Sequence, residues 1–411
     1  MEVPLSVLAI CPRGLELIVS NELTYLLPHI KPKIKKGGVF FIATAEEVCM
    51  LNLWARTPTR LLILLTRTQT NSARELYSCS HQIQWKNWFL PGRTIKVDVN
   101  GRGFPKDVSL RYASLIVKDA ICDSFRNDYG VRPTVDTKNP DIRIWVNFDN
   151  SLVTISIDST GQPLYKRGWR KDGFIAPLKE NLAASLIRLT EWDKKTPIID
   201  PMCGSGTFII EAAGIAAKLP ANFIMSKKRV FSYELFADSS PFGNVNTKKI
   251  YSNAEKVWKM WSEKLHAYPS LFGFDISEEN IDKAKKNAFR ALPEPLAEKI
   301  SWGVKSLHAL TRPNFDKGLI ITNPPYGKRM GKISSMDELI TMLSSILKKQ
   351  FTGWSIWILT NEKELVSKIK LRASEKIALK NGDIECFWCK FDIFRGSKFR
   401  KEKSYDNIEQ S

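Results

Sequence analysis

The chain has 411 residues, and its 62 Lys and Arg residues outnumber its 43 Asp and Glu residues to give a formal net charge of +19. This length favours two or three domains, and a hydrophobic content of 43% is typical of packed cores and excludes a fully disordered chain. The excess positive charge favours a polyanionic partner such as a nucleic acid. Charge alone does not separate RNA from DNA, from an anionic membrane, or from a basic surface that binds nothing.

Signals for targeting, disulfides and metals are few. No apolar run approaches the ~18 residues that span a bilayer, and the first ten residues lack the basic start of a signal peptide. The seven cysteines are odd in number and widely spaced, which is typical of reduced thiols in the cytoplasm. Cys386 and Cys389 have CxxC spacing without a second pair or a nearby His, so we expect them in a strand and expect no metal site. The sequence therefore predicts a cytoplasmic protein without a membrane segment.

The N-terminal part of the chain alternates short strands with amphipathic helices. Hydrophobic spacing predicts strands at residues 7–10 and 95–99 and helices at 14–27 and 112–125. A hairpin follows, because alternating runs at 142–148 and 153–157 flank the turn sequence Asp149-Asn150-Ser151. We interpret this part as two small α+β units.

A basic stretch at residues 164–171 follows these units. Lys166, Arg167, Trp169 and Arg170 interleave cations with an aromatic ring, a pattern that suits contact with RNA phosphates and bases. We predict that these four residues bind RNA, although a solvated linker between domains would have a similar composition.

The C-terminal part repeats the order strand, helix, strand. Strands are predicted at residues 197–200, 270–274, 318–322 and 355–360, and helices at 208–217, 278–291 and 337–351. Continuous apolar strands that alternate with helices indicate a parallel sheet with helices on both faces. An insert at about residues 218–269 separates the first helix from the second strand and contains a helix near 254–266. The charged tail from residue 397 is expected to be disordered.

The first chemical motif lies where a predicted strand ends and a helix begins, and it reads Asp200-Pro201-Met202-Cys203-Gly204-Ser205-Gly206-Thr207. Glycines at such a turn let the backbone approach a ligand, and the helix N-terminus offers free N–H groups. The motif lacks the third glycine of the dinucleotide fingerprint and the lysine of a P-loop, so a nucleoside triphosphate is not expected. Asp200 would repel a phosphate and attract an ammonium group, which favours the amino-acid half of S-adenosylmethionine. We assign to the cofactor site Asp200, Met202, Cys203, Gly204, Gly206 and Thr207.

The second motif places an acid at the end of the next strand, in the sequence Gly273-Phe274-Asp275-Ile276-Ser277. A carboxylate there can accept hydrogen bonds from both hydroxyls of a ribose. Asp275 could instead cap the following helix, a role that Ser277 can also fill. The strand context favours ribose binding, and we assign Asp275 and Ile276 to the cofactor site.

The third motif is Asn323-Pro324-Pro325-Tyr326-Gly327, which follows an apolar strand. The two prolines fix their φ angles and stiffen the turn, so Asn323 is held in place. The Asn323 side-chain oxygen and the Pro324 carbonyl oxygen can accept the two protons of an exocyclic base amine, which aims the nitrogen lone pair at a methyl donor. Tyr326 can stack on the extruded base. We assign Asn323, Pro324 and Tyr326 as catalytic residues, with Asn323 also lining the cofactor; an ordinary proline-rich turn is the alternative.

With these motifs in this order, the chain resembles the THUMP-domain class I RNA guanine-N2 methyltransferases, in particular the bacterial type that acts on 23S rRNA. The resemblance covers nearly the whole chain, at residues 11–16, 65–159, 164–170, 176–184, 200–207, 275, 323–327 and 381–386. It implies an α/β fold in which small α+β ferredoxin-like and THUMP domains precede a Rossmann-like class I methyltransferase domain. The implied divisions are a ferredoxin-like domain at 1–64, a THUMP RNA-binding domain at 65–165, a methyltransferase domain at 166–396 and a tail at 397–411.

The resemblance also implies an activity, which is transfer of a methyl group from S-adenosylmethionine to the N2 amine of a guanosine in 23S rRNA. We expect no membrane partner; the sequence does not predict the oligomeric state, and a monomer is assumed. The family usually carries an acid after the third strand, where it contacts the adenine amine. Here the equivalent stretch reads Gly303-Val304-Lys305-Ser306-Leu307, and we assign Ser306 to this position of the cofactor site.

Several alternatives stay open. The same chemistry could act on a tRNA guanosine or on adenine N6, because the Asn-Pro-Pro-Tyr loop can hold any amine. A glutamine methyltransferase would use a similar loop, but the basic N-terminal part disfavours a protein substrate. A non-catalytic RNA-binding factor for ribosome assembly would suit the missing acid, whereas the intact Asn323 and Tyr326 disfavour it.

Overall fold

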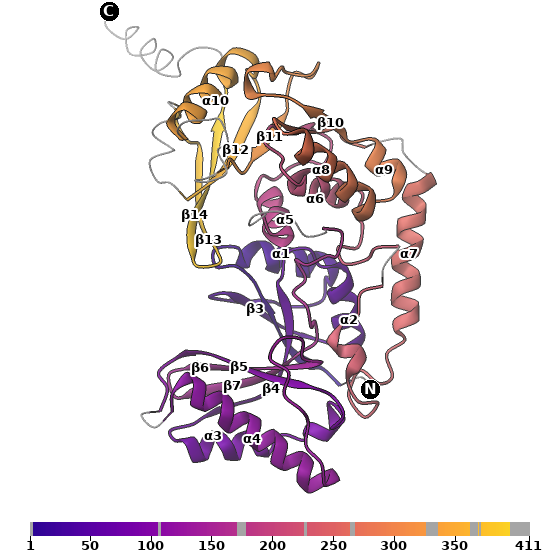
Figure 1. Ribbon diagram of the computed structural model, residues 1–411, viewed down its shortest axis with the longest axis vertical. Coiled ribbons are helices and arrows are strands. Elements are labelled where there is room, and N and C mark those ends of the chain that lie inside the picture. Colours follow the sequence, from indigo (N-terminus) through magenta and orange to yellow (C-terminus); the bar gives the residue numbers. More distant parts are fainter. Residues whose placement is uncertain are drawn as a thin grey trace, which may run out of the picture. The chain divides into compact units, whose positions relative to one another are not determined.

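The computed structural model describes residues 3–105, 108–170, 178–225, 228–263, 268–325, 336–361, 369 and 371–394 (Figure 1). The chain forms two compact units. The first unit contains Met1–Gly168 and Pro220–Lys256, and the second contains Trp169–Leu219 and Val257–Ser411.

The first unit is built on one seven-stranded sheet of order β2-β3-β1-β4-β7-β6-β5. Its strands are β1 (Leu5–Ile10), β2 (Lys33–Lys35), β3 (Gly38–Ala43), β4 (Arg60–Gln69), β5 (Ile95–Arg102), β6 (Ile142–Asp149) and β7 (Leu152–Asp158). Neighbouring strands are antiparallel except β5 and β6, which are parallel. The expected hairpin is formed by β6 and β7, and Asn150 in its turn adopts a left-handed φ of +55°.

Strand β4 is shared by the two small α+β parts. Its first residues pair with β1, and residues from Leu62 onward pair with β7, with an irregularity between Leu64 and Thr66. The expected division between residues 64 and 65 therefore falls inside a continuous strand. One sheet, rather than a linker, joins the two parts.

Helices of the first unit are α1 (Glu16–Leu26), α2 (Ala45–Trp54), α3 (Ala73–His81) and α4 (Leu110–Tyr129), with a short 3-10 turn η1 (Trp85–Asn87). Helix α4 begins where the Ser109 hydroxyl accepts a hydrogen bond from the Tyr112 N–H, and it ends at Gly130 with φ +72°. Figure 1 shows α3 and α4 along one face of the strands β4 to β7. The buried residues on that face of β6 are every second residue, from Ile142 to Phe148, as half-buried strands require.

The insert packs with the first unit, although the sequence places it inside the interval expected for the methyltransferase domain. It contains the 3-10 turn η2 (Ser232–Leu235) and the start of α7 (Thr247–Glu263). Phe231, Tyr233 and Phe242 stack in series, with ring centroids 5.3 and 6.0 Å apart, and they join the core of the sheet. Helix α7 also begins earlier than the expected helix at 254–266.

The second unit contains a sheet of order β10-β9-β8-β11-β12-β14-β13. Its strands are β8 (Ile198–Asp200), β9 (Leu271–Asp275), β10 (Ser301–Val304), β11 (Leu319–Thr322), β12 (Ser355–Thr360), β13 (Glu375–Asn381) and β14 (Ile384–Asp392). The first five strands in the order are parallel, as expected, but β14 is antiparallel to both of its neighbours. A tight turn with Gly382 at φ +66° joins β13 to β14 within residues 381–386, so an antiparallel hairpin extends the expected parallel strands at this end of the sheet.

Strand order fixes where the motifs meet. From β8 the chain builds outward through β9 and β10, and then crosses to the other side of β8 to form β11 and β12. In sheets of this kind, ligands bind at the carboxyl ends of the strands where the order reverses. The helices that connect and cover the strands are α5 (Glu180–Leu189), α6 (Thr207–Ala216), α8 (Glu278–Ala291), α9 (Glu294–Glu298), α10 (Met336–Gln350) and the 3-10 turn η3 (Leu307–Ala309).

Three further expectations concern the tail, membranes and the CxxC pair. The tail at 397–411 lies outside the described residues. Within the described part of the chain, no helix is long and apolar enough to cross a membrane. Cys386 and Cys389 lie in β14, as expected, and both are buried. Because they are three residues apart, they face opposite sides of the strand and do not form a pair.

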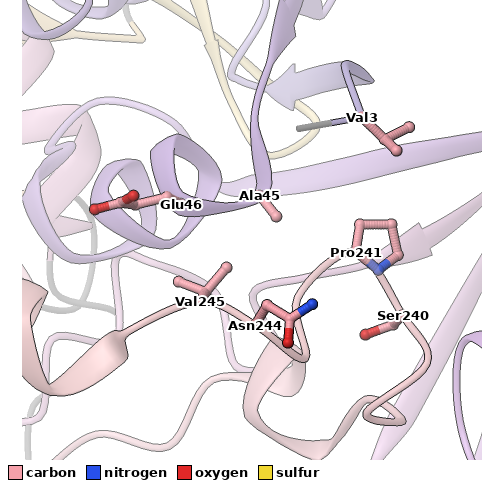
Figure 2. A pocket seen from close by; sticks show the side chains of 7 residues that line it. All are labelled: Val3, Ala45, Glu46, Ser240, Pro241, Asn244 and Val245. Atoms are coloured by element: carbon pink, nitrogen blue, oxygen red, sulfur yellow. The ribbon is translucent and has the colours of Figure 1, made fainter. Parts of the chain in front are cut away.

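Figure 2 shows a pocket of about 340 Å³ in the first unit, lined by Val3, Ala45, Glu46, Ser240, Pro241, Asn244 and Val245. Its lining has no cation, and the Glu46 carboxylate points away from the other labelled side chains.

Candidate cofactor and catalytic site

The turn between β8 and α6 is ordered by its own hydrogen bonds. Asp200, the last residue of β8, is buried, and its Oδ1 accepts the Met202 N–H at 3.2 Å. The Cys203 N–H donates to the Phe274 carbonyl at 2.8 Å, and the Gly206 N–H donates to the Cys203 carbonyl at 2.8 Å. Hydrogen bonds within the protein thus fix the turn against the end of β9 without the help of a ligand.

Glycine is favoured at the two glycine positions of this turn for different structural reasons. Both adopt left-handed φ angles, +50° at Gly204 and +80° at Gly206, where a side chain is strained. A Cβ on Gly206 would lie 2.7 Å from Cη2 of Trp302, whereas a Cβ on Gly204 would meet nothing within 4 Å. Packing therefore requires Gly206, and Gly204 leaves an open cradle over the turn that a ligand can approach.

Asp275 ends β9 and reaches this turn. Its Oδ2 accepts the Gly204 N–H at 2.9 Å, and its Oδ1 accepts the Ser277 N–H at 2.9 Å and the Asn280 amide at 3.1 Å. Helix α8 is capped instead by Ser277, whose hydroxyl accepts the Asn280 N–H at 3.3 Å. A carboxylate has about four acceptor positions, so three donors leave room for a ligand hydroxyl. The geometry fits the ribose role better than the capping role.

An apolar surface lies beside Asp275. Ile276 is 68% exposed and Val304, which pairs with Asp275 across the strands, is 52% exposed. Two large apolar side chains next to a buried acid provide a surface on which a flat ring can lie. Ser306 is half-buried at the start of η3 and makes no capping hydrogen bond, so its hydroxyl can serve a ligand there.

The third motif reaches the same edge of the sheet. Strand β11 pairs with β8 through Leu319 and Ile198, so Asn323, just beyond the end of β11, lies at the edge that carries Asp200. Asn323 is half-buried and Pro324 is buried. Tyr326 lies outside the described residues, and its assignment as a catalytic residue stays a prediction.

Burial controls the ionisation of this edge. Desolvation by burial raises the pKa of Asp200 to about 8, and the nearby charge of Asp275 acts in the same direction. Burial also raises the pKa of the Cys203 thiol well above its ordinary value, so Cys203 stays protonated and is no nucleophile. A cation beside Asp200 would favour the ionised carboxylate.

The basic stretch is mostly interior, which corrects the prediction that all four of its residues bind RNA. Arg167 is 3% exposed and donates to the Arg56 carbonyl at 2.9 Å, and Trp169 is 2% exposed. Arg170 hydrogen bonds to the Thr207 hydroxyl at 2.8 Å, inside the second unit. Backbone and side-chain oxygens accept hydrogen bonds from both guanidinium groups, and of these four residues only Lys166 is exposed. The contact between Arg170 and Thr207 was not predicted from the sequence, because no local pattern encodes it.

No metal site is indicated among the residues that the structure describes. They contain no group of three or more His, Cys, Asp or Glu side chains that could hold an ion.

A Rossmann-like sheet with this strand order, with a glycine turn and two acids at its switch point, defines a class I methyltransferase fold. Comparison with protein-family models assigns the chain more narrowly. It belongs to the RMKL-like methyltransferase-domain family, whose model matches residues 167–390. The THUMP-domain model matches residues 70–158 and the RlmL ferredoxin-like model matches residues 6–62. The family resemblance expected from the motifs is confirmed.

Among curated proteins, the chain is similar to ribosomal RNA large subunit methyltransferases K/L of several bacteria. That of Shewanella frigidimarina is 32% identical over 92% of this chain and 51% of the relative. That of Vibrio parahaemolyticus is 33% identical over 98% of this chain and 54% of the relative. The chain thus spans about half the length of these relatives.

Solved structures share the fold. SMU.472, assigned as a methyltransferase and solved with SAH, has a TM-score of 0.80 and 26% identity, covering 97% of this chain and all of SMU.472. A possible methylase from Clostridium difficile 630 has a TM-score of 0.80 and 27% identity over 96% of this chain and all of that one. TrmN from Thermus thermophilus, at 19% identity and a TM-score of 0.66 over 95% of this chain and all of TrmN, shows the fold alone.

The raised pKa of Asp200 predicts that binding of an ammonium-bearing ligand releases a proton. With the pKa at about 8, the carboxyl is mostly protonated at pH 7 and must ionise to face an ammonium group, so affinity should fall as pH falls from 8 to 6. Calorimetry with SAH, the ligand of SMU.472, should give heats at pH 7 that differ between Tris and phosphate, two buffers with different ionisation enthalpies. Asp200→Asn should remove this difference, and equal heats for the unmodified protein would contradict the assignment.

Proposed function

We propose that this chain transfers a methyl group from S-adenosylmethionine to the exocyclic N2 amine of a guanosine in large-subunit rRNA. The observation that carries the proposal is the meeting of Asn323 and Pro324 with Asp200 and the Gly204 turn at one edge of the sheet. The curated relatives, named as ribosomal RNA large subunit methyltransferases, support the substrate. An rRNA substrate would place the enzyme in the cytoplasm.

The residues at this edge fit each part of S-adenosylmethionine. Asp200 can pair with the ammonium group of the cofactor, and Asp275 can accept hydrogen bonds from the ribose hydroxyls. Ile276 and Val304 can pack against one face of the adenine. Ser306 offers a hydroxyl to the adenine amine in the position where the family usually has an acid. When bound, the cofactor supplies an electrophilic methyl group on its sulfonium.

The chain's own residues would then orient the base. The lone pair of a guanine N2 amine is delocalised into the ring, so the amine is a poor nucleophile. Acceptance of its two protons by the Asn323 side-chain oxygen and the Pro324 carbonyl oxygen favours a pyramidal nitrogen with its lone pair directed at the methyl group. These acceptors are held in place by the proline turn and act most strongly as charge develops on the nitrogen. The surplus proton of the methylated amine passes to water.

RNA binding is supported by an exposed basic segment, residues 31–36, which forms the first arm of the β2–β3 hairpin and which we call the basic hairpin. Lys31, Lys33, Lys35 and Lys36 are all exposed, and residues 28–38 contain no acid. Strand β2, inside this hairpin, is the edge strand of the first sheet. Lysines on an edge strand also prevent pairing with other chains, but four of them without an acid provide a concentrated site for phosphates.

Asn323→Ala should slow methyl transfer by about 10²-fold while leaving RNA affinity nearly unchanged, because it removes an acceptor that acts in the transition state. Single-turnover transfer of a tritiated methyl group to rRNA measures the rate. Asn253→Ala, at an exposed position of α7, is the matched control. Transfer by Asn323→Ala at the unmodified rate would exclude this residue from the chemistry.

The modified nucleoside tests the choice of base and RNA. Bulk rRNA and tRNA from a strain that lacks the gene are methylated separately with the purified protein and digested to nucleosides. N2-methylguanosine formed in large-subunit rRNA is expected. N6-methyladenosine, or label confined to tRNA, would overturn the base or the RNA assignment.

Reversal of the basic hairpin should weaken RNA binding. Changing Lys31, Lys33, Lys35 and Lys36 to Glu keeps charges on the edge strand but repels phosphates, so we expect at least a tenfold loss of affinity. The slope of log affinity against log salt should flatten by about 0.7–0.9 for each phosphate that the variant no longer neutralises. A control with the same change of net charge replaces Lys285, Lys286, Lys317 and Lys349, all exposed. Equal losses in the two variants would show that only overall charge matters.

A further inference from the structure

We propose that Arg170 is a positioning residue for the carboxylate end of the cofactor's amino-acid part rather than an RNA contact. This inference rests on the proposed function. From the sequence, Arg170 was expected to bind RNA. In the structure its side chain instead contacts Thr207, at the end of the glycine turn between β8 and α6.

Contacts on several sides fix the Arg170 side chain. Its Nη2 donates to the Thr207 hydroxyl at 2.8 Å and to the Leu178 carbonyl at 3.2 Å, and its Nη1 lies 3.6 Å from a carboxylate oxygen of Glu180. The guanidinium carbon lies 4.9 Å from the ring centroid of Trp169. The side chain is 15% exposed. An RNA phosphate has little of this guanidinium left to contact.

These contacts continue into the glycine turn. Thr207 is the first residue of α6, and its hydroxyl lies 3.0 Å from the hydroxyl of Ser205. From the other side, the Asn287 amide donates to the Ser205 carbonyl at 3.2 Å. The turn that carries Gly204 and Gly206 is therefore held between Arg170 and Asn287.

The charge of Arg170 is unusual for its position. A cation beside the N-terminus of a helix opposes the helix dipole, which favours anions there. Glu180 offsets part of this cost, but the guanidinium and the amides of α6 still add positive potential at the same end of the turn. A zwitterionic amino-acid group suits such a turn, with its ammonium at Asp200 and its carboxylate toward α6. Arg170 acts there through Thr207 and through its field, without touching the cofactor.

A ligand without the carboxylate separates this role from simple structural support. Binding of S-adenosylmethionine and of decarboxylated S-adenosylmethionine is measured by calorimetry for the unmodified protein, Arg170→Met and Arg170→Lys, with Arg312→Met as a control at an exposed arginine. Arg170→Met should weaken S-adenosylmethionine binding about tenfold and decarboxylated S-adenosylmethionine binding by less than threefold. Arg170→Lys, which keeps the charge, should recover most of the preference for the carboxylate.

Three results would overturn the inference. They are equal losses for both ligands in Arg170→Met, no loss in either, and a preference that Arg170→Lys fails to recover although its melting temperature matches that of the unmodified protein. RNA affinity and its salt dependence should stay unchanged in Arg170→Met. A fall in RNA affinity without any change in cofactor affinity would show that Arg170 contacts RNA instead. Failure of the unmodified protein to bind S-adenosylmethionine would instead refute the proposed function.

Discussion

The candidate site depends on the hydrogen bond from the Gly204 N–H to the Asp275 carboxylate, at 2.9 Å. This bond joins the ends of β8 and β9, and the nearby bond from the Cys203 N–H to the Phe274 carbonyl reinforces it. The Gly204 amide can turn toward Asp275 because glycine tolerates φ +50°. The open cradle over Gly204 and the acid beside it are therefore formed by one interaction, and a change that moved either strand end would remove both.

The same edge places two acids near each other, and the fold tolerates them by keeping one protonated. Desolvation raises the pKa of Asp200, and the charge of Asp275 adds to that effect. Asp275 accepts hydrogen bonds from three donors, whereas burial leaves Asp200 less well compensated even though it accepts the Met202 N–H. The ammonium group of the proposed cofactor would supply a counter-charge for Asp200, and its binding would then be coupled to deprotonation of this carboxyl group.

Local pattern predicted much of the second unit and little of its long-range packing. Helix α8 has the expected bounds because its apolar residues recur at helical spacing and Ser277 caps it. The motifs were expected to meet because the carboxyl ends of parallel strands share one edge. The strand that holds Cys386 and Cys389 was expected, but its pairing with β12 and the packing of the insert were not. The stacking of Phe231 on Tyr233 and the pairing of β14 with β12 are determined by tertiary contacts, which leave no periodic signal.

Buried arginines account for the largest error, and they change how the net charge is understood. Arg56, Arg60 and Arg167 are each less than 9% exposed, and burial lowers the pKa of Arg229 to about 10. A planar guanidinium can satisfy several carbonyl oxygens at once, as Arg167 and Arg229 do, whereas an ammonium group on a flexible stem usually stays hydrated. Arg167 and Arg229 hold backbone segments in place through their hydrogen bonds. Exposed lysines such as Lys33 and Lys35 can contact a polyanion. The formal charge of +19 therefore includes buried cations that no partner can reach, and exposed cations such as the lysines of residues 31–36 are where we propose that a polyanion binds.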